Sequence, residues 1–149
     1  MSTEPVHQEC IDTCNSLLRG EISAVETFRQ AKEKFAGQPQ AIVLSEICST
    51  HEDHVARIRE HITSKGGSPD ESSGAWGTFV AAVEGAAKLF GETTALQALI
   101  EGERHGISSY ESALANDHVS AEAKDLYRSK FIPTLESNIA RLEALQEVG

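Results

Sequence analysis

Aromatic residues and basic residues are scarce in this sequence, and long apolar runs are missing. Phe, Trp and Tyr make up 5% of the chain, whereas Ala, Leu, Glu and Ile are plentiful, a mixture that favours helix over sheet. Only 13 Lys and Arg stand against 23 Asp and Glu. The formal charge of −10 argues against nucleic acid or an anionic membrane as partner, because both reward clustered positive charge. No stretch approaches the roughly 18 uninterrupted apolar residues of a membrane span.

Cysteine is also rare, with three residues that show no spacing typical of a disulfide framework. An odd, small number of cysteines suits a reducing compartment. The opening MSTEPVHQEC lacks the basic-then-apolar pattern of a secretory signal, so we expect a cytoplasmic protein. Cys10 and Cys14 share a helix face; we interpret them first as small core residues and second as ligands or redox thiols. The role of Cys48 stays open.

Glycine and proline divide the chain into helices of one domain spanning 1–149. The main helices are expected over 3–35, 39–64, 94–117 and 120–147, with a short apolar helix over 75–90. Ser120 is the expected cap of the last helix, and Thr94 with Gln97 forms a capping-box pattern. Pro133 should kink the last helix because proline removes a backbone donor.

The lengths of the connections predict the topology. A few residues join the first two helices and the last two, which favours two antiparallel hairpins. About 30 residues, including the short helix, separate the hairpins, and a long middle connection is typical of the ferritin-like arrangement. We therefore predict an all-α, ferritin-like antiparallel four-helix bundle.

An internal repeat supports two equivalent hairpins. A shift of 82 residues carries the first helix onto the third, and one of 84 carries the second onto the fourth. The first shift superimposes Glu21 on Glu103 and Phe28 on Tyr110, and the second superimposes Arg57 on Arg141. A pseudo-two-fold axis should relate the two halves.

Each inward apolar stripe is interrupted near its middle by polar residues. These interruptions are Glu21, His51 with His54, Glu103 and Asn138. At about 1.5 Å of rise per residue, most of them lie at one level of the bundle, with Asn138 fitting less well. We predict a buried polar layer there.

Two interpretations of this layer are open. A buried carboxylate is costly unless it is paired or bound to metal, and one divalent cation could bind Glu21, His51, His54 and Glu103. Zinc, iron and manganese all suit such ligands. Alternatively, His–Glu hydrogen bonds form a dry polar layer that sets the helix register. His61 could continue the histidine stripe by a turn or two, but such a residue is more often a satisfied or half-exposed histidine, and its role stays open.

The segments LLRGEISAVETF with STHEDHVARI, and LIEGERHGISSY with LESNIARL, resemble the rubrerythrin and ferritin-like superfamily. They are most similar to small bacterial ferritin-like proteins of unknown function that are often associated with stress responses. In di-iron members each half supplies one Glu from its first helix and a Glu-x-x-His from its second. Glu21, Glu103 and His54 match that set, whereas His51, Leu135 and Asn138 depart from it.

The resemblance therefore implies a degenerate di-iron site. Both bridging carboxylates are missing, so we do not expect ferroxidase or oxidase activity, and at most one ion is expected. Tyr110 is interpreted either as a hydrogen-bond donor to the site or as plain packing, as at Phe28.

Two functional classes remain from the sequence. The protein is either a stress-related metal-binding bundle or a metal-free bundle that serves as an oligomeric interaction module. Apolar residues of 75–90, namely Trp76, Phe79, Val83 and Phe90, could cover the bundle or pair two subunits, and we expect a homodimer. No motif for a small-molecule substrate is present.

Overall fold

The computed structural model describes residues 3–73 and 91–148, and every regular element in these two ranges is a helix. The elements are α1 (Thr3–Lys34), α2 (Gln40–Ser64), α4 (Glu92–Leu114), α5 (Ala121–Leu126), the π-helix η2 (Tyr127–Phe131) and α6 (Ile132–Val148). The predicted all-α bundle is confirmed. The helix expected over 75–90 lies outside the described residues. Among the helices described, none has the length and apolar character needed to cross a bilayer.

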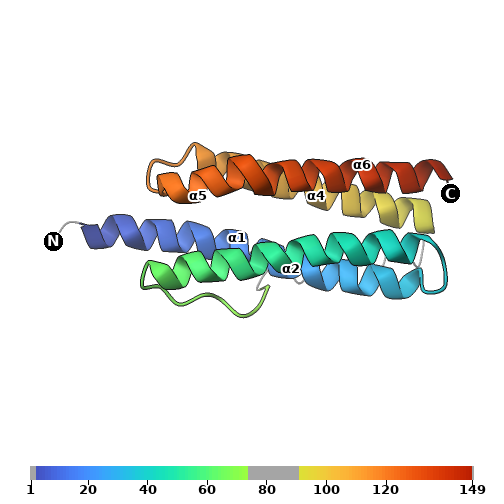
Figure 1. Cartoon of the computed structure of the whole chain (residues 1–149), viewed down its shortest axis with the longest axis horizontal. Coiled ribbons are helices and arrows are strands. Elements are labelled where there is room, and N and C mark those ends of the chain that lie inside the picture. Colours follow the sequence, from blue (N-terminus) through green and yellow to red (C-terminus); the bar gives the residue numbers. More distant parts are fainter. Residues whose placement is uncertain (1–2, 74–90, 149) are drawn as a thin grey trace.

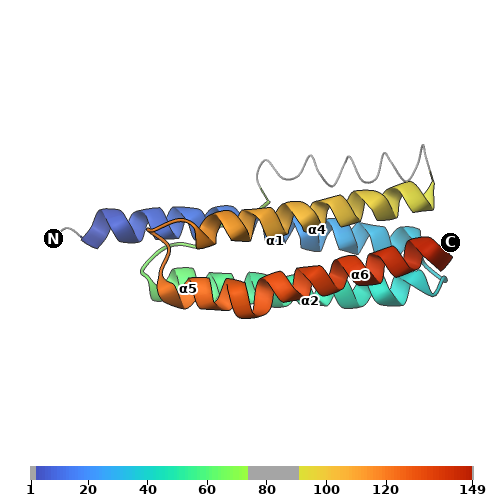
Figure 2. The same cartoon turned by 90° about the horizontal axis from the view of Figure 1, so that it is seen from above.

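The helices form two hairpins that lie side by side in an elongated bundle (Figure 1). One hairpin pairs α1 with α2, and the other pairs α4 with the run α5–η2–α6; contacts within the hairpins exceed those between them. Seen from above, α1 lies beside α4 and α2 lies beside α6 (Figure 2). Residues from all four sides of the bundle can therefore meet on its axis.

The connection between α1 and α2 is short because glycine and proline shape it. Gly37 has a φ of 84°, a left-handed conformation that other residues rarely adopt. Pro39 precedes α2, where its fixed φ suits a helix start. The buried ring of Phe35 anchors the turn to the core. This turn sets the antiparallel register of α1 and α2.

The last predicted helix is interrupted by a π-helical turn. Ser120 caps its start as expected, accepting a hydrogen bond from the Ala123 amide at 3.1 Å. The kink predicted at Pro133 stays a prediction; the irregularity that the structure shows is η2, which ends two residues earlier. A π turn is one way for a helix to accommodate a missing backbone donor. The run from α5 to α6 thus remains a single helical side of the bundle.

The capping box predicted at Thr94 is wrong. The helix α4 begins at Glu92, two residues earlier, after Gly91 with a φ of 92°, and no side chain caps it. The positive φ of Gly91 turns the chain into α4 directly before Glu92, so Thr94 already lies inside the first turn of the helix. The shift is less than one turn and leaves the inward stripe of α4 unchanged.

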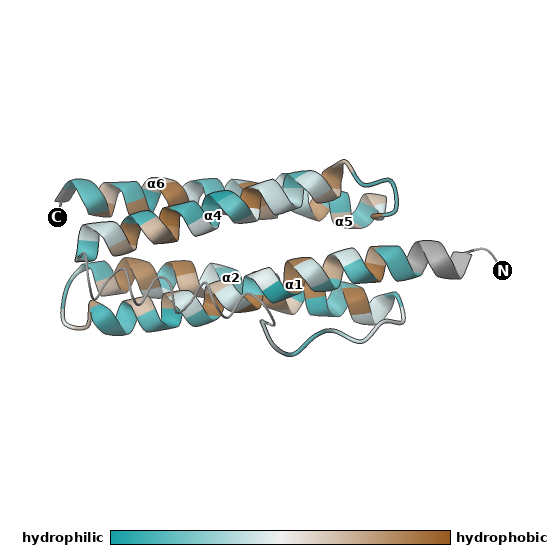
Figure 3. Ribbon diagram, turned by 180° about the vertical axis from the view of Figure 1, so that it is seen from behind, coloured by the Kyte–Doolittle hydropathy of each residue, from teal (hydrophilic) through white to brown (hydrophobic). Residues whose placement is uncertain are grey.

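Apolar and polar residues alternate along each helix, as the hydropathy colouring shows (Figure 3). The core contains the large buried side chains Leu18, Phe35, Leu44, Ile58, Ile62, Leu99, Ile100 and Phe131, among others. Buried with them are the polar residues Glu21, His51, His54, Glu103 and Asn138. The predicted interruptions of the apolar stripes therefore point inward.

Candidate metal centre

His51 lies at the centre of the buried polar layer. Its Nδ1 atom is 2.5 Å from Oε1 of Glu21. Its Nε2 atom is 3.0 Å from Oε2 and 2.9 Å from Oε1 of Glu103. The imidazole, which α2 supplies, thus links a carboxylate on α1 to a carboxylate on α4. This single side chain ties the two hairpins together.

Glu21 receives two further contacts on its other oxygen. Nδ1 of His54 lies 3.0 Å from Oε2, and the Tyr110 hydroxyl donates a hydrogen bond to the same oxygen. His54 sits three residues after His51, so both rings project from one face of α2. The carboxylate of Glu21 is 5% exposed, and all of its charge must be stabilised by these neighbours.

The fourth side of the layer comes from α6. Nδ2 of Asn138 donates to Oε2 of Glu103 at 2.9 Å and to Oγ1 of Thr50 at 3.1 Å. The sequence placed Asn138 least well in the layer, yet its amide is 2% exposed and contacts the site directly. Thr50 was not predicted to be a residue of the layer; what could have indicated it in the sequence is its position next to His51 on α2.

Two phenylalanines hold the histidine rings in place. Phe28 stacks on His51 with ring centroids 5.3 Å apart and an interplanar angle of 18°. Phe131 stacks on His54 at 4.0 Å and 29°. These rings restrict the rotation of the imidazoles and keep water from that side of the layer. The histidine nitrogens are therefore preorganised toward Glu21.

Burial and mutual contact change the acidity of the layer. Burial alone would raise the pKa of Glu21, but the charge and hydrogen bonds of His51 and His54 lower it below its usual value. Burial disfavours a charged His51, but Glu103 and Glu21 raise its pKa well above the usual value. A charged Glu21 is therefore stabilised inside the bundle by the imidazoles that contact it.

Three of the four predicted ligands offer atoms close enough to share one ion. The ligand atoms of Glu21, His51 and His54 all lie within 4.8 Å of one another, and all three residues are buried. Glu103 is not a member of this group, because it contacts the opposite nitrogen of His51. The four residues meet in one layer, as expected, and their role as metal ligands stays a prediction.

A cavity of about 350 Å³ reaches the layer between α1 and α4. Small residues line it, including Gly20, Ala24, Gly102 and Gly106, and Glu21, His51 and Glu103 contribute its polar wall. Gly106 also keeps the helices close, since a Cβ there would lie 3.2 Å from Cδ1 of Leu135. The carboxylates of Glu21 and Glu103 therefore border this cavity.

These features define a class: an all-helical bundle with a buried Glu–His layer shared by both hairpins. Residues 9–116 match the family described as Domain of unknown function (DUF2383), and the chain belongs to this family. No curated protein and no solved structure matches the chain. The match includes Glu21, His51, His54, Glu103 and Tyr110, so most of the layer lies in the family's own region.

Proposed function

We propose that this protein is a ferritin-like bundle that binds one divalent metal ion in its polar layer. The observation that carries the proposal is the buried group formed by Glu21, His51 and His54, whose ligand atoms lie within 4.8 Å of one another. One carboxylate and two imidazoles are a ligand set that zinc, iron and manganese all accept. The two-hairpin arrangement and the internal repeat support the ferritin-like assignment.

Glu103 has a distinct role in this proposal. Histidines that bind metal usually donate their second ring N–H to a carboxylate or carbonyl, which fixes the tautomer and the ring orientation. Glu103 occupies that position on Nε2 of His51, which leaves Nδ1 for the ion. Asn138 in turn orients Glu103 through its amide. We therefore assign binding to Glu21, His51 and His54, and positioning to Glu103.

Two-metal oxidase chemistry is not part of the proposal. A second ion needs ligands in the second hairpin, where Leu135 and Asn138 stand at the positions equivalent to His51 and His54. Leu135 has no ligand atom, and the Asn138 amide donates to Glu103. A single ion held in this way has a structural role or a weak redox role. A role in stress responses rests on the resemblance alone.

A second candidate function is favoured by a specific observation. His51, His54, Tyr110 and Asn138 already pair with the two carboxylates through hydrogen bonds. A polar layer closed in this way can fix the register of the bundle without metal. The protein would then be an interaction module whose partners bind elsewhere.

Elemental analysis of the purified, untagged protein separates the two candidates. The protein is washed with chelator, dialysed, and refilled with zinc, iron or manganese in turn. We expect the wild-type protein to bind about one equivalent of metal at the polar layer. Glu21→Gln and His54→Ala should each lose that equivalent. The measurement is repeated in a Cys14→Ser background, so that thiol-bound metal cannot contribute.

Matched controls come from exposed residues of the same types. Glu52 is half exposed on α2 beside Arg29, and His118 is half exposed beside Glu9. Glu52→Gln and His118→Ala should keep the full metal content. Metal content equal in Glu21→Gln and Glu52→Gln would overturn the proposal in favour of the metal-free layer. Two layer-dependent equivalents of iron would restore a di-iron centre.

Two other predictions stay predictions. The homodimer is an expectation from the sequence, and the apolar residues of 75–90, which could either cover the bundle or pair two subunits, lie outside the described residues. Its test is the molar mass in solution, measured by light scattering. A cytoplasmic location, expected from the sequence, is tested by fractionating cells that express the protein.

A further inference from the structure

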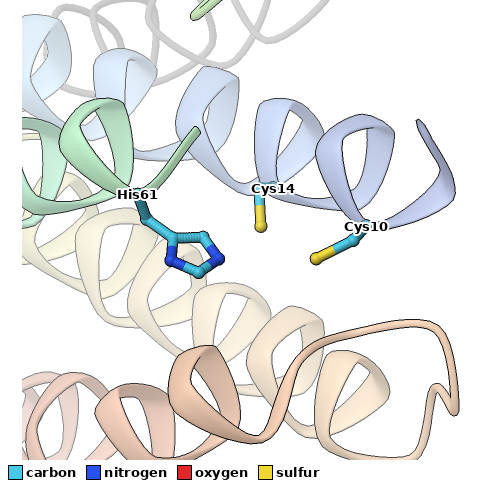
Figure 4. Close-up of side chains that lie close together, drawn as sticks. All are labelled: Cys10, Cys14 and His61. Carbon is cyan, nitrogen blue, oxygen red and sulfur yellow. The ribbon is translucent and has the colours of Figure 1, made fainter. Parts of the chain in front are cut away.

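A second group of ligand-type side chains lies one heptad away from the polar layer. Cys10 and Cys14 on α1 and His61 on α2 have ligand atoms that all lie within 4.8 Å of one another. Figure 4 shows the two cysteines on one helix and His61 on its neighbour, with the two sulfur atoms and the imidazole turned toward the same space. Both cysteines are buried and free, and they are 4% and 0% exposed.

The antiparallel register of α1 and α2 explains why these residues meet. Cys14 lies seven residues before Glu21, and His61 lies seven residues after His54. A heptad is two helical turns, so the pairing of Glu21 with His54 implies a pairing of Cys14 with His61. Cys10 adds one further turn on the same face of α1. One heptad from the carboxylate–imidazole contact, the same register thus brings two thiols and an imidazole to within 4.8 Å of one another.

One nitrogen of the His61 imidazole has no hydrogen-bond partner among the described residues. The side chain is 9% exposed, and the unpaired atom is the buried Nε2. Nδ1 lies 3.6 Å from Oε1 of Glu122, on the other side of the ring. In Figure 4 one ring nitrogen is turned toward the two sulfurs. A buried nitrogen left unpaired destabilises the folded state, so a partner is expected at that point.

We propose that Cys10, Cys14 and His61 form a second, separate metal site that takes a thiophilic divalent cation, with zinc as the natural occupant. Two sulfurs and one imidazole nitrogen are a ligand set for tetrahedral zinc with the fourth position left to water or another ligand. Both thiols lose their protons to solvent on binding, and Nε2 donates its lone pair to the ion. The site does not depend on metal binding at Glu21.

The surroundings fit this chemistry. The Tyr127 hydroxyl lies 3.3 Å from Sγ of Cys14, where it can donate to a thiolate and orient it. Burial lowers the pKa of His61, which favours the neutral ring that a metal requires. Burial raises the pKa of Cys14 to about 11, so the metal-free thiol stays protonated and unreactive. Simple core packing explains the two cysteines but leaves Nε2 of His61 without a partner in the part of the chain that the structure describes.

Cobalt(II) is the probe, because its binding to thiolate gives a charge-transfer absorption that carboxylate and imidazole ligands do not. The full-length protein is reduced, freed of metal and titrated with Co²⁺, and zinc is then added as competitor. We expect one equivalent of Co²⁺ to produce the thiolate band and zinc to abolish it. Cys14→Ser and His61→Gln should each weaken Co²⁺ binding at least tenfold, and Cys14→Ser should reduce the band.

Cys48→Ser is the matched control. Cys48 is also buried, on α2, but its Sγ contacts the Val25 carbonyl at 3.6 Å and lies outside the group. This variant and Glu21→Gln should both keep the band, which separates the second site from the polar layer. Absence of a thiolate band in the reduced wild-type protein would overturn the proposal, as would equal Co²⁺ affinity in wild type and His61→Gln. If Cys14→Ser fails to fold, as judged by circular dichroism, His61→Gln decides the matter.

Discussion

The Tyr110 hydroxyl donates a hydrogen bond to Oε2 of Glu21, the oxygen that also lies 3.0 Å from Nδ1 of His54. The internal repeat superimposes Tyr110 on Phe28, which stacks on His51 instead. The two equivalent positions of the repeat thus contact the layer differently. Tyr110 on α4 donates a hydrogen bond, whereas Phe28 on α1 stacks on an imidazole ring. The two hairpins are equivalent in fold but not in chemistry.

Tyr110→Phe should destabilise the protein by about 1.5–3 kcal/mol, the usual loss for a hydrogen bond to a buried charge. The substitution preserves the ring, so the loss reports the hydroxyl alone. Burial and the neighbouring Glu21 raise the pKa of Tyr110 well above its usual value, so the hydroxyl is protonated and able to donate. Urea denaturation followed by circular dichroism measures the change.

Tyr127→Phe is the matched control for that experiment. Tyr127 is equally buried, but its hydroxyl contacts the neutral sulfur of Cys14. Its loss should cost less, about 0.5–1.5 kcal/mol. Equal losses in the two variants would show that the Tyr110 hydroxyl does not stabilise a charged Glu21.

Removal of metal should lower the stability of the wild-type protein. An ion present at 100 times its dissociation constant stabilises the folded state by about 2.7 kcal/mol, which corresponds to about 5–10 °C in Tm for a domain of this size. Thermal unfolding is compared in chelator and in excess manganese, which binds thiolates poorly. Glu21→Gln should show no difference between the two conditions. A shift of the same size in wild type and Glu21→Gln would mean that manganese does not bind the layer.

The helices were predictable because their signals are local. The inward stripes, Gly37 and the Ser120 cap gave the spans of α1, α2 and the run beginning at α5 to within a few residues. The helix start predicted at Thr94 was wrong because a capping-box pattern does not reveal that the helix already begins after Gly91, a few residues earlier. Pro133 signalled an irregularity, but whether a helix kinks or forms a π turn depends on packing against its neighbours.

The residues of the layer were predictable, but their pairing was not. Depth along the bundle follows from counting residues, and it placed Glu21, His51 and His54 together. Which carboxylate oxygen contacts which nitrogen depends on side-chain rotation, which only the packed structure fixes. The same count of residues, continued for one heptad along both helices, also places Cys14 near His61. It was missed because buried cysteines usually serve as apolar residues.

Asn138→Ala should weaken the layer from the side of α6. The substitution removes the amide that donates to Glu103, so among the described residues this buried carboxylate keeps the hydrogen bond with His51 and loses the one with Asn138. The expected loss is about 1.5–3 kcal/mol in urea denaturation. Thr50→Val is the control, because it removes the other contact of Asn138 and leaves Glu103 untouched; its loss should be smaller, about 0.5–1.5 kcal/mol. A larger loss in Thr50→Val would place the main role of Asn138 away from Glu103.

The stability of the metal-free protein should pass through a maximum in mildly acidic solution. The pKa of His51 is raised in the folded state, so its contribution is complete below its ordinary value of 6.5 and is lost as the pH rises through the raised value. The pKa of Glu21 is lowered, so its contribution is complete above its ordinary value of 4.5 and is lost as the pH falls through the lowered value. The free energy of unfolding in chelator should therefore be highest between the two ordinary values, 4.5 and 6.5, and should fall at lower and at higher pH.

Substitution of His51 isolates the alkaline side of that profile. His51→Gln cannot carry the proton, so its stability should be lower in mild acid and should no longer fall as the pH rises above neutrality. A wild-type profile that stays flat on the alkaline side, or a His51→Gln profile that still declines, would show that no imidazolium lies between Glu21 and Glu103. Added metal should oppose the alkaline decline in the wild type, because the ion binds the deprotonated ring and competes with the proton for Nδ1.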